Sequence, residues 1–354
     1  MMRTRHIRWR IAGMMGLLII SLIVLFFLEL ILGSVAIPYT EIISILMGGG
    51  SSQQSWISII HNFRLPKAIT GACAGACLAI AGLLMQTLFR NPLAGPDVLG
   101  LSAGAGLGVA IVVLTAGTTG ASSILGNLGF LGSVGIALAA SLGSGLVLMM
   151  ILIVSKKVRN TMTILILGLM FGYTANSFIS ILMHFALAER IQAYTIWSFG
   201  SFGGATWDQI HVLVIFALSG LIMSIFLIKH LNVLLLGDQY AESMGLDLGG
   251  ARRKIFIITA ILSGVVTAFC GPIGFIGIAV PHICRALFAT ANHSILIPGC
   301  ILVGACLALT ADIIASVPGS PTTLPLNAIT SLIGAPVVIW VIFSKSRQGS
   351  EVSV

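Results

Sequence analysis

The chain has 354 residues, of which 57% are hydrophobic and only 8% are charged, and its mean hydropathy is +1.10. A water-soluble protein of this length needs far more charged side chains to cover its surface. The composition therefore excludes a soluble globular protein and indicates a polytopic membrane protein. The apolar runs are long and unbroken, which disfavours a transmembrane β-barrel with its short alternating strands.

The chain has a net charge of +8, and its basic residues cluster in short connections between apolar runs. Basic connections of this kind are typical of cytoplasmic loops and do not indicate nucleic-acid binding. With the N-terminus inside the cell, 15 of the 18 Lys and Arg residues fall on the cytoplasmic side, and only Arg64, Lys67 and Arg190 fall outside. This asymmetry predicts that both termini are cytoplasmic, which requires an even number of spans.

The apolar runs predict an all-α protein with ten membrane-spanning helices in one transmembrane domain, residues 1–354. The first run, from Ile11 to Leu32, is long enough to cross a bilayer, which favours an uncleaved helix over a signal peptide. A break at Gly271-Pro272 blurs the boundary between the seventh and eighth spans. The predicted spans are 11–33, 66–89, 98–117, 129–154, 161–185, 209–229, 255–270, 273–291, 295–316 and 327–344.

Small residues in these spans are interpreted as packing residues. Gly71 and Gly75 form a GxxxG pair, which predicts a helix contact within the chain. The run GAGLG at 104–108 lacks the preceding strand and the following acidic residue of a dinucleotide-binding loop. All six cysteines lie in apolar stretches without CxxC spacing, so we expect neither a disulfide nor a metal site.

The sequence contains no catalytic constellation. The ten acidic residues lie almost entirely in loops or at helix ends, so the mid-membrane carboxylates needed for proton or sodium coupling are missing. His282 lies near the cytoplasmic end of a span interrupted by Pro and Gly, and we expect it to be a hydrogen-bonded helix-end residue. The chain is therefore expected to move something without an energy source of its own.

One cytoplasmic loop, 231–254, has features of a contact site for another protein. Its centre predicts a short helix from Asp238 to Met244, with Asp238 as the N-cap and Gly245 as the stop. A short helix along the membrane face suits contact with a soluble partner, and it suits simple contact with lipid equally well. The residues of this element are Asp238, Gln239, Tyr240, Ala241, Glu242, Ser243, Met244 and Gly245.

Several segments together resemble one family, the FecCD-type permease subunits of bacterial ABC importers for iron–siderophores, haem and cobalamin. They cover nearly the whole chain after the first helix, in the order found in the family. The segments are RLPK (64–67), GLLMQTLFRNPLAGPDVLGLSAGAGLG (82–108), WSFGSFGGATW (197–207), LNVLLLGDQYAESMGLDLGGARR (231–253), GPIGFIGIAVPHICR (271–285), LTADIIAS (309–316) and LPLNAITSLIGAPVVIW (324–340).

The resemblance implies a multi-pass subunit of the bacterial cytoplasmic (inner) membrane that pairs with a second permease subunit, identical or homologous. It also implies two ATPase subunits, which bind ATP and Mg, and a periplasmic or lipid-anchored solute-binding protein. The chain itself is then no enzyme and binds no cofactor.

The resemblance also implies roles for particular residues. Arg64 and Lys67 match basic residues that receive glutamates of the binding protein, and the helix at 238–245 matches the element that couples to the ATPase. Thr161 and Met162 match the cytoplasmic gate of the family.

The chain departs from the family pattern at four places. Ser316 stands where an arginine often follows the aspartate Asp312, and Asn327 ends a segment that usually reads Glu-Leu-Pro-x-Gly. Val338 stands where an aromatic residue is usual. Lys67 replaces a common arginine, which keeps the charge but loses the bidentate fork.

The interpretation is an ATP-driven importer of a metal chelate, with an iron–siderophore first and haem or cobalamin as further candidates. An ion-coupled secondary transporter is the alternative, and it needs a buried ionisable site. An intramembrane enzyme needs convergent nucleophile, base or metal ligands, which the sequence lacks. A passive scaffold would tolerate substitution at Thr161 and Met162. The sequence fixes neither the chelate nor the choice between a homodimer and a heterodimer.

Overall fold

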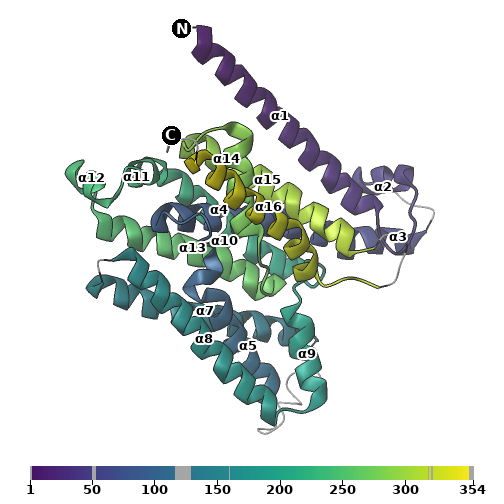
Figure 1. The fold of residues 1–354 in the computed structure, drawn as a ribbon. Coiled ribbons are helices and arrows are strands. Elements are labelled where there is room, and N and C mark those ends of the chain that lie inside the picture. The colour runs from purple at the N-terminus through teal and green to yellow at the C-terminus, as the bar shows by residue number, and fades with distance from the viewer. Residues whose placement is uncertain are drawn as a thin grey trace.

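The computed structural model describes residues 2–49, 53–115, 129–158, 160–317, 319 and 322–350, and these residues form helices joined by short turns (Figure 1). The long helices are α1 (Met2–Ile31), α4 (Leu65–Phe89), α5 (Leu101–Thr115), α7 (Gly129–Lys157), α8 (Thr161–Phe185), α10 (Trp207–Phe226), α13 (Leu248–Cys270), α14 (Ile276–Phe288), α15 (His293–Ala315) and α16 (Leu326–Ser350). Shorter elements are α2 (Tyr39–Leu46), α3 (Gln54–Ile59), the π-helical turn η1 (Ile60–Arg64), the 3₁₀ turn η2 (Pro96–Leu99), α9 (Ala188–Ser198), α11 (Ile228–Leu234) and α12 (Asp238–Ser243).

The helices match the spans expected from hydropathy. Seven helical segments of the described chain are long and apolar enough to cross a membrane, and three shorter apolar helices lie at 101–115, 276–288 and 326–340. Together they confirm the all-α prediction of about ten spans. α14 is short because the chain leaves α13 at Gly271 and does not resume a helix until Ile276, which confirms the break expected there.

Two of the connections between the predicted spans contain helices. The segment 34–63 carries α2, α3 and η1, and the segment 186–208 carries α9. The run of glycines and serines at 48–52 lies partly outside the described residues, at 50–52. All six cysteines are free thiols, and four of them are buried, as expected for small residues of the apolar core.

Helix α4 lies at the centre of the molecule. Twenty of its 25 residues are buried, and it contacts α15, α13, α14 and α10. A helix that is apolar on every face lies either in the core of a protein or against lipid, and α4 lies in the core. α1, by contrast, lies at the edge of the bundle and extends away from it toward the N-terminus (Figure 1).

Glycines let the neighbours of α4 approach its backbone. A Cβ atom at Gly75 would lie 2.2 Å from the carbonyl oxygen of Gly304 in α15, and one at Gly82 would lie 1.7 Å from that of Gly277 in α14. The GxxxG pair is therefore a contact within one chain, as predicted. The GAGLG run has the same role, because a Cβ at Gly108 would lie 2.0 Å from the Ala139 carbonyl oxygen in α7.

We expect Gly75→Ala to destabilise the protein by about 1–3 kcal/mol, because the added methyl group forces α4 and α15 apart. Gly145→Ala in α7 is the matched control, since its Cβ would meet nothing within 4 Å. Thermal denaturation in detergent micelles should give a lower midpoint for Gly75→Ala than for the unaltered protein, and an equal or higher one for Gly145→Ala. Equal midpoints for the two variants would contradict the close contact.

Candidate functional site

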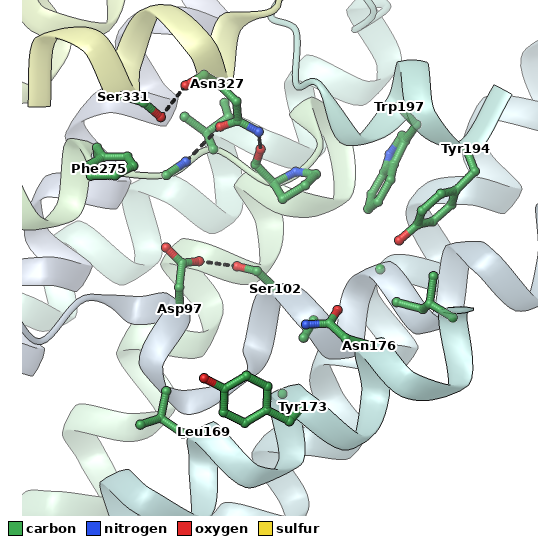
Figure 2. Close-up of a pocket in the computed structure, with 17 residues that line it drawn as sticks. Asp97, Ser102, Leu169, Tyr173, Asn176, Tyr194, Trp197, Phe275, Asn327 and Ser331 are labelled. Atoms are coloured by element: carbon green, nitrogen blue, oxygen red, sulfur yellow. Dashed lines mark hydrogen bonds between the residues drawn. The ribbon is translucent and has the colours of Figure 1, made fainter. Parts of the chain in front are cut away.

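A pocket with a few polar side chains on a mainly apolar lining opens where five elements meet. It has a volume of about 520 Å³ and lies between η2, α5, α8, α9 and the start of α16, beside the turn 271–275 (Figure 2). Asp97 lies on η2 and accepts a hydrogen bond from the Ser102 hydroxyl at the start of α5. Tyr173 and Asn176 face the pocket from α8, and Tyr194 faces it from α9.

The surroundings of Asp97 and Tyr194 shift the pKa of both side chains. The Asp97 side chain is open to the pocket but enclosed by protein beyond it, and this enclosure raises the pKa of its carboxyl. The hydrogen bond from Ser102 opposes the shift, because it stabilises the ionised form. Burial raises the pKa of the Tyr194 phenol, so its hydroxyl stays protonated and able to donate a hydrogen bond.

Asn327 holds one wall of the pocket together. Its Nδ2 donates to the carbonyl oxygens of Ser198, at 3.1 Å, and Pro272, at 2.5 Å. Its Oδ1 accepts from the backbone N–H of Gly274 at 3.0 Å. The residue that departs from the family pattern thus ties the start of α16 to α9 and to the turn before α14.

The turn before α14 is strained. Phe275 has a φ of +67°, which is unfavourable for a residue with a side chain, and Gly271 has a φ of +75°. The break frees backbone groups that a continuous helix would satisfy, and Asn327 satisfies two of them, at Pro272 and Gly274.

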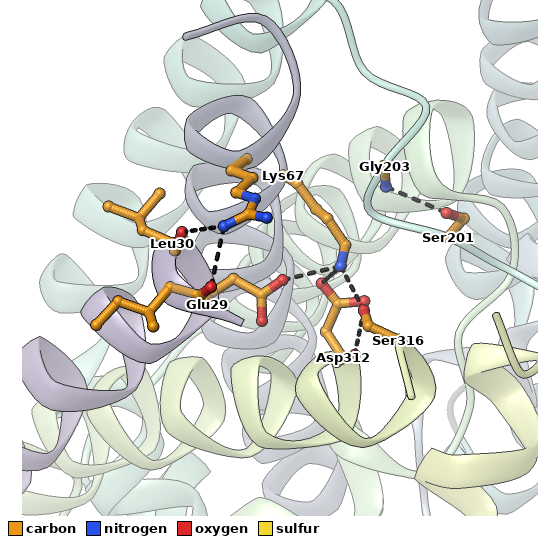
Figure 3. A network of polar contacts seen from close by, with 9 residues as sticks. Glu29, Leu30, Lys67, Ser201, Gly203, Asp312 and Ser316 are labelled. Carbon is orange, nitrogen blue, oxygen red and sulfur yellow. Dashed lines mark hydrogen bonds and ion pairs between the residues drawn. The ribbon is translucent and has the colours of Figure 1, made fainter. Parts of the chain in front are cut away.

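Of the two basic residues predicted for docking, Lys67 lies in the first turn of α4, in a second polar cluster (Figure 3), and Arg64 is the last residue of η1. Lys67 Nζ lies 2.8 Å from Glu29 Oε1 of α1 and 3.2 Å from Asp312 Oδ2 of α15. It also donates to Ser316 Oγ at 2.6 Å. We call Glu29, Lys67 and Asp312 the charge cluster.

The charge cluster is largely withdrawn from solvent. The Glu29 and Asp312 side chains are 3% and 7% exposed, and that of Lys67 is 23% exposed. One ammonium group therefore lies between two carboxylates, and Glu29 Oε2 is buried without a hydrogen-bond partner. Burial of such charges is tolerated only when they are paired. The structure places these acidic residues at helix ends, as predicted. The sequence does not indicate that they are buried.

Arg64 is bound within the chain as well. Its guanidinium donates to the carbonyl oxygens of Leu30, at 2.7 Å, and Ile31, at 3.0 Å, and also to that of Val35. The Leu30 and Ile31 carbonyls lie at the C-terminal end of α1, where backbone acceptors lack partners within the helix, and Val35 lies in the turn that follows. Arg64 and Lys67 together fix the end of α1 to α4 and α15, while their predicted role in docking stays a prediction.

The predicted coupling helix forms at α12 and is stabilised differently from the prediction. The N-cap is Gly237, with a φ of +105°, and not Asp238. The Asp238 carboxylate instead pairs with Arg252 of α13 at 2.9 Å. Only glycine adopts the backbone conformation at 237 without strain, and this explains the correction.

The side chains of α12 divide between a buried and an exposed face. Ala241 is fully buried against the bundle, whereas Tyr240 is 69% exposed and Met244, directly after the helix, is 64% exposed. Gly245, with a φ of +83°, ends the element as predicted. The remaining predicted residues, Gln239, Glu242 and Ser243, lie on or beside the exposed face.

The predicted gate residues open α8. Asn160 is the N-cap, and its Oδ1 accepts from the backbone N–H of Met162 at 2.9 Å. The Met162 side chain is 52% exposed, and that of Thr161 is half-buried.

His282 is hydrogen-bonded, as predicted, but it lies in the middle of α14 and not at a helix end. Its Nε2 lies 2.7 Å from the Pro92 carbonyl oxygen, in the connection between α4 and η2. Nearby, the His293 ring bridges Thr87 and Asn232, at 2.8 Å from each. No group of His, Cys, Asp or Glu side chains among the described residues is arranged to hold a metal ion.

Comparisons with known proteins agree on one family. The model of the FecCD transport family matches residues 21–344. The hemin transport system permease protein HmuU of Yersinia pestis is 31% identical over 95% of this chain and 97% of its own length. The vitamin B12 import system permease protein BtuC of Klebsiella pneumoniae is 34% identical over 83% of this chain and 86% of its own.

A solved structure supports the fold. A metal-chelate type ABC transporter in an inward-facing conformation is 24% identical, with a TM-score of 0.80 over 94% of this chain and 99% of the other. At this identity the likeness establishes the arrangement of helices alone.

We expect Lys67→Met to destabilise the protein by about 3 kcal/mol, because it leaves two buried carboxylates without a cation. This is the lower end of the range for a broken buried pair, since Lys67 is partly exposed. Lys67→Arg is the control that keeps the charge. The midpoint of denaturation in detergent measures the effect.

The triple variant Glu29→Gln/Lys67→Met/Asp312→Asn should recover most of the stability that Lys67→Met loses, because no charge remains unpaired. If Lys67→Met is as stable as Lys67→Arg, the charge cluster does not hold the three helices together.

Proposed function

Because the chain belongs to the FecCD transport family, we propose that it is the membrane-spanning permease subunit of an ATP-driven importer for a metal chelate. An iron–siderophore is our first candidate cargo, with haem and cobalamin next. In this proposal a solute-binding protein delivers the chelate from outside, and two ATPase subunits, which hold ATP and Mg, drive its passage. The subunit lies in the inner membrane with both termini in the cytoplasm.

One observation supports the ATP-driven mechanism above the others. α12 is fixed to the bundle by buried Ala241 and by the Asp238–Arg252 pair, and it presents Tyr240 and Met244 outward. Exposed aromatic and Met side chains on a rigidly held helix are typical of protein interfaces. We therefore assign this face to the ATPase subunit.

Force on α12 reaches the rest of the bundle through α13. α12 packs on α11 and α13, α13 packs on α5 and α7, and α5 packs on α8. Closure of the ATPase subunits would displace α12 and, through this chain of contacts, α8. Movement of α8 carries Thr161 and Met162, which we assign to the cytoplasmic gate.

A second permease subunit, identical or homologous, is expected to cover part of α8. This helix leaves large apolar side chains such as Ile166, Tyr173 and Phe178 more than half exposed. A conduit between two such helices would be lined mainly by apolar and small residues.

The alternative function is ion-coupled transport, and the charge cluster favours it, because buried carboxylates are typical of ion pathways. The cluster lies at the ends of α1, α4 and α15 and not at their middle, and both of its carboxylates pair with the same ammonium group of the chain. The importer therefore remains the better-supported proposal.

We expect the double variant Tyr240→Ala/Met244→Ala to retain ATPase subunits about 30-fold less well, which corresponds to about 2 kcal/mol lost at an interface hot spot. ATP-driven uptake of a ferric trihydroxamate or cyanocobalamin into proteoliposomes should fall with it. Leu187→Ala is the control, since Leu187 is 64% exposed but far along the chain from α12. Uptake that follows an ion gradient without ATPase subunits would contradict the proposal.

Docking of the binding protein at Lys67 requires an exchange of ion-pair partners, because the ammonium group already pairs with Glu29 and Asp312. An acidic side chain from the binding protein would displace one of them.

The triple variant described above tests this exchange, since it is expected to fold without a charge at position 67. We expect its affinity for the cognate solute-binding protein in nanodiscs to be at least about tenfold weaker than that of the unaltered permease. Its retention of ATPase subunits, measured alongside, should not change. Unchanged affinity for the binding protein would show that Lys67 has no role in docking and only holds α1, α4 and α15 together.

A further inference from the structure

We propose that the pocket beside Asp97 is a subsite for hydrogen-bond donors on the outer surface of the transported chelate, with the Asp97 carboxylate as their acceptor. This inference rests on the proposed function and narrows its cargo. It assigns to the importer a neutral or cationic chelate that carries amide or hydroxyl groups, and not a chelate rich in carboxylates.

The pocket has the size and position of a ligand site. Its volume of about 520 Å³ falls within the range of small-molecule pockets, so it accommodates one side of a chelate or a peripheral arm. Its walls come from segments far apart in the sequence, which meet at the break between α13 and α14 (Figure 2). Irregular backbone at such a break is tolerated where it lines a cavity.

The charge of the pocket selects the ligand chemistry. Among its described lining residues, Asp97 is the one acidic side chain, and none is Lys, Arg or His. Ser102 bonds Oδ1, and no described residue donates to Oδ2. An ionised carboxylate only accepts hydrogen bonds, and bonds to it are stronger than those between neutral groups.

Two further polar groups extend the site. The Asn176 amide and the Tyr194 hydroxyl point into the pocket (Figure 2) and have no side-chain hydrogen bond within the described chain. Both groups can donate and accept, so they complement the amide or hydroxyl groups of a ligand that reaches Asp97.

Another wall of the pocket is fixed by hydrogen bonds within the chain and carries an aromatic ring. Asn327 fixes the turn at Pro272 and Gly274, and the Trp197 ring lines the pocket next to Tyr194, with ring centroids 5.9 Å apart. A ligand that fits a preformed wall loses less free energy to ordering on binding.

The same arrangement disfavours anionic cargo. A carboxylate of the ligand placed here would face Asp97 without a cation between them, and like-charge contact of this kind is a means of discrimination. Ferric citrate and haemin carry such carboxylates, whereas a neutral ferric trihydroxamate and cyanocobalamin present amide groups.

The test measures the binding of these four probes to the full-length permease in nanodiscs. Quenching of Trp197 fluorescence reports the binding. Subtraction of the signal of Trp197→Phe isolates this residue from the other four tryptophans. We expect the neutral ferric trihydroxamate or cyanocobalamin to quench Trp197 at concentrations at least about tenfold lower than ferric citrate or haemin. We expect Asp97→Asn to weaken binding of the neutral probes about tenfold, since an ionised acceptor is replaced by a neutral one. The difference in binding between the neutral and the carboxylate-bearing probes should become smaller.

The preference of the unaltered protein is informative even if Asp97→Asn fails to fold. Equal binding of all four probes, tighter binding of the carboxylate-bearing probes, or quenching by none of them overturns the subsite. An unchanged preference in folded Asp97→Asn overturns it too. ATP-driven uptake by the assembled importer is measured separately. If uptake of a probe needs ATP while the preference is absent, only the subsite fails, whereas uptake independent of ATP removes the proposed function itself.

Discussion

The close backbone contact between α4 and its neighbours is the constraint on which the structure depends. α4 is enclosed by α15, α13, α14 and α10, and glycines at 75 and 82 bring the backbones of α15 and α14 against it. Between transmembrane helices, where lipid is as apolar as the side chains, such contact supplies much of the packing attraction. The two polar sites are connected to opposite ends of this helix. The charge cluster lies at its start, and the connection to η2 and Asp97 follows its end.

The fixed position of α4 gives the two sites different characters. At Lys67, one ammonium group and two carboxylates from three helices meet in a largely buried cluster, and the ammonium group has little capacity for an outside partner unless a bond is exchanged. At Asp97, the helices separate around a strained turn, and polar groups remain open to a cavity. Dense packing at the helix thus coexists with a loosely filled region beside it, and only the latter has room for a ligand.

The fold was largely predictable because its signals are local. Apolar run length gives the spans, and the GxxxG pair at Gly71 and Gly75 gives a close helix contact. The charge cluster was not predictable, since Lys67 meets Glu29 from 38 residues away and Ser316 from 249 residues away, and no local pattern reports such pairs. The N-cap of α12 was predicted wrongly because Asp238 is a good cap by type, yet Gly237 alone adopts the required φ. Asn327 did carry a signal, as a departure from the family pattern, but the sequence does not show which backbone groups it binds.

Asn327 also shows how a break in a membrane helix is made stable enough to be useful. Interrupting a helix at 271–275 exposes carbonyl and N–H groups that lipid cannot satisfy, and each such group is costly in an apolar medium. The single amide of Asn327 bonds Pro272 and Gly274 of the turn, and also Ser198 of α9, so one side chain replaces several helical hydrogen bonds. Glycine, the usual family residue at this position, has no side chain to do this. The chain therefore combines an open polar pocket with a wall that is fixed from within, and a fixed wall is what allows one carboxylate, Asp97, to discriminate between ligands by charge.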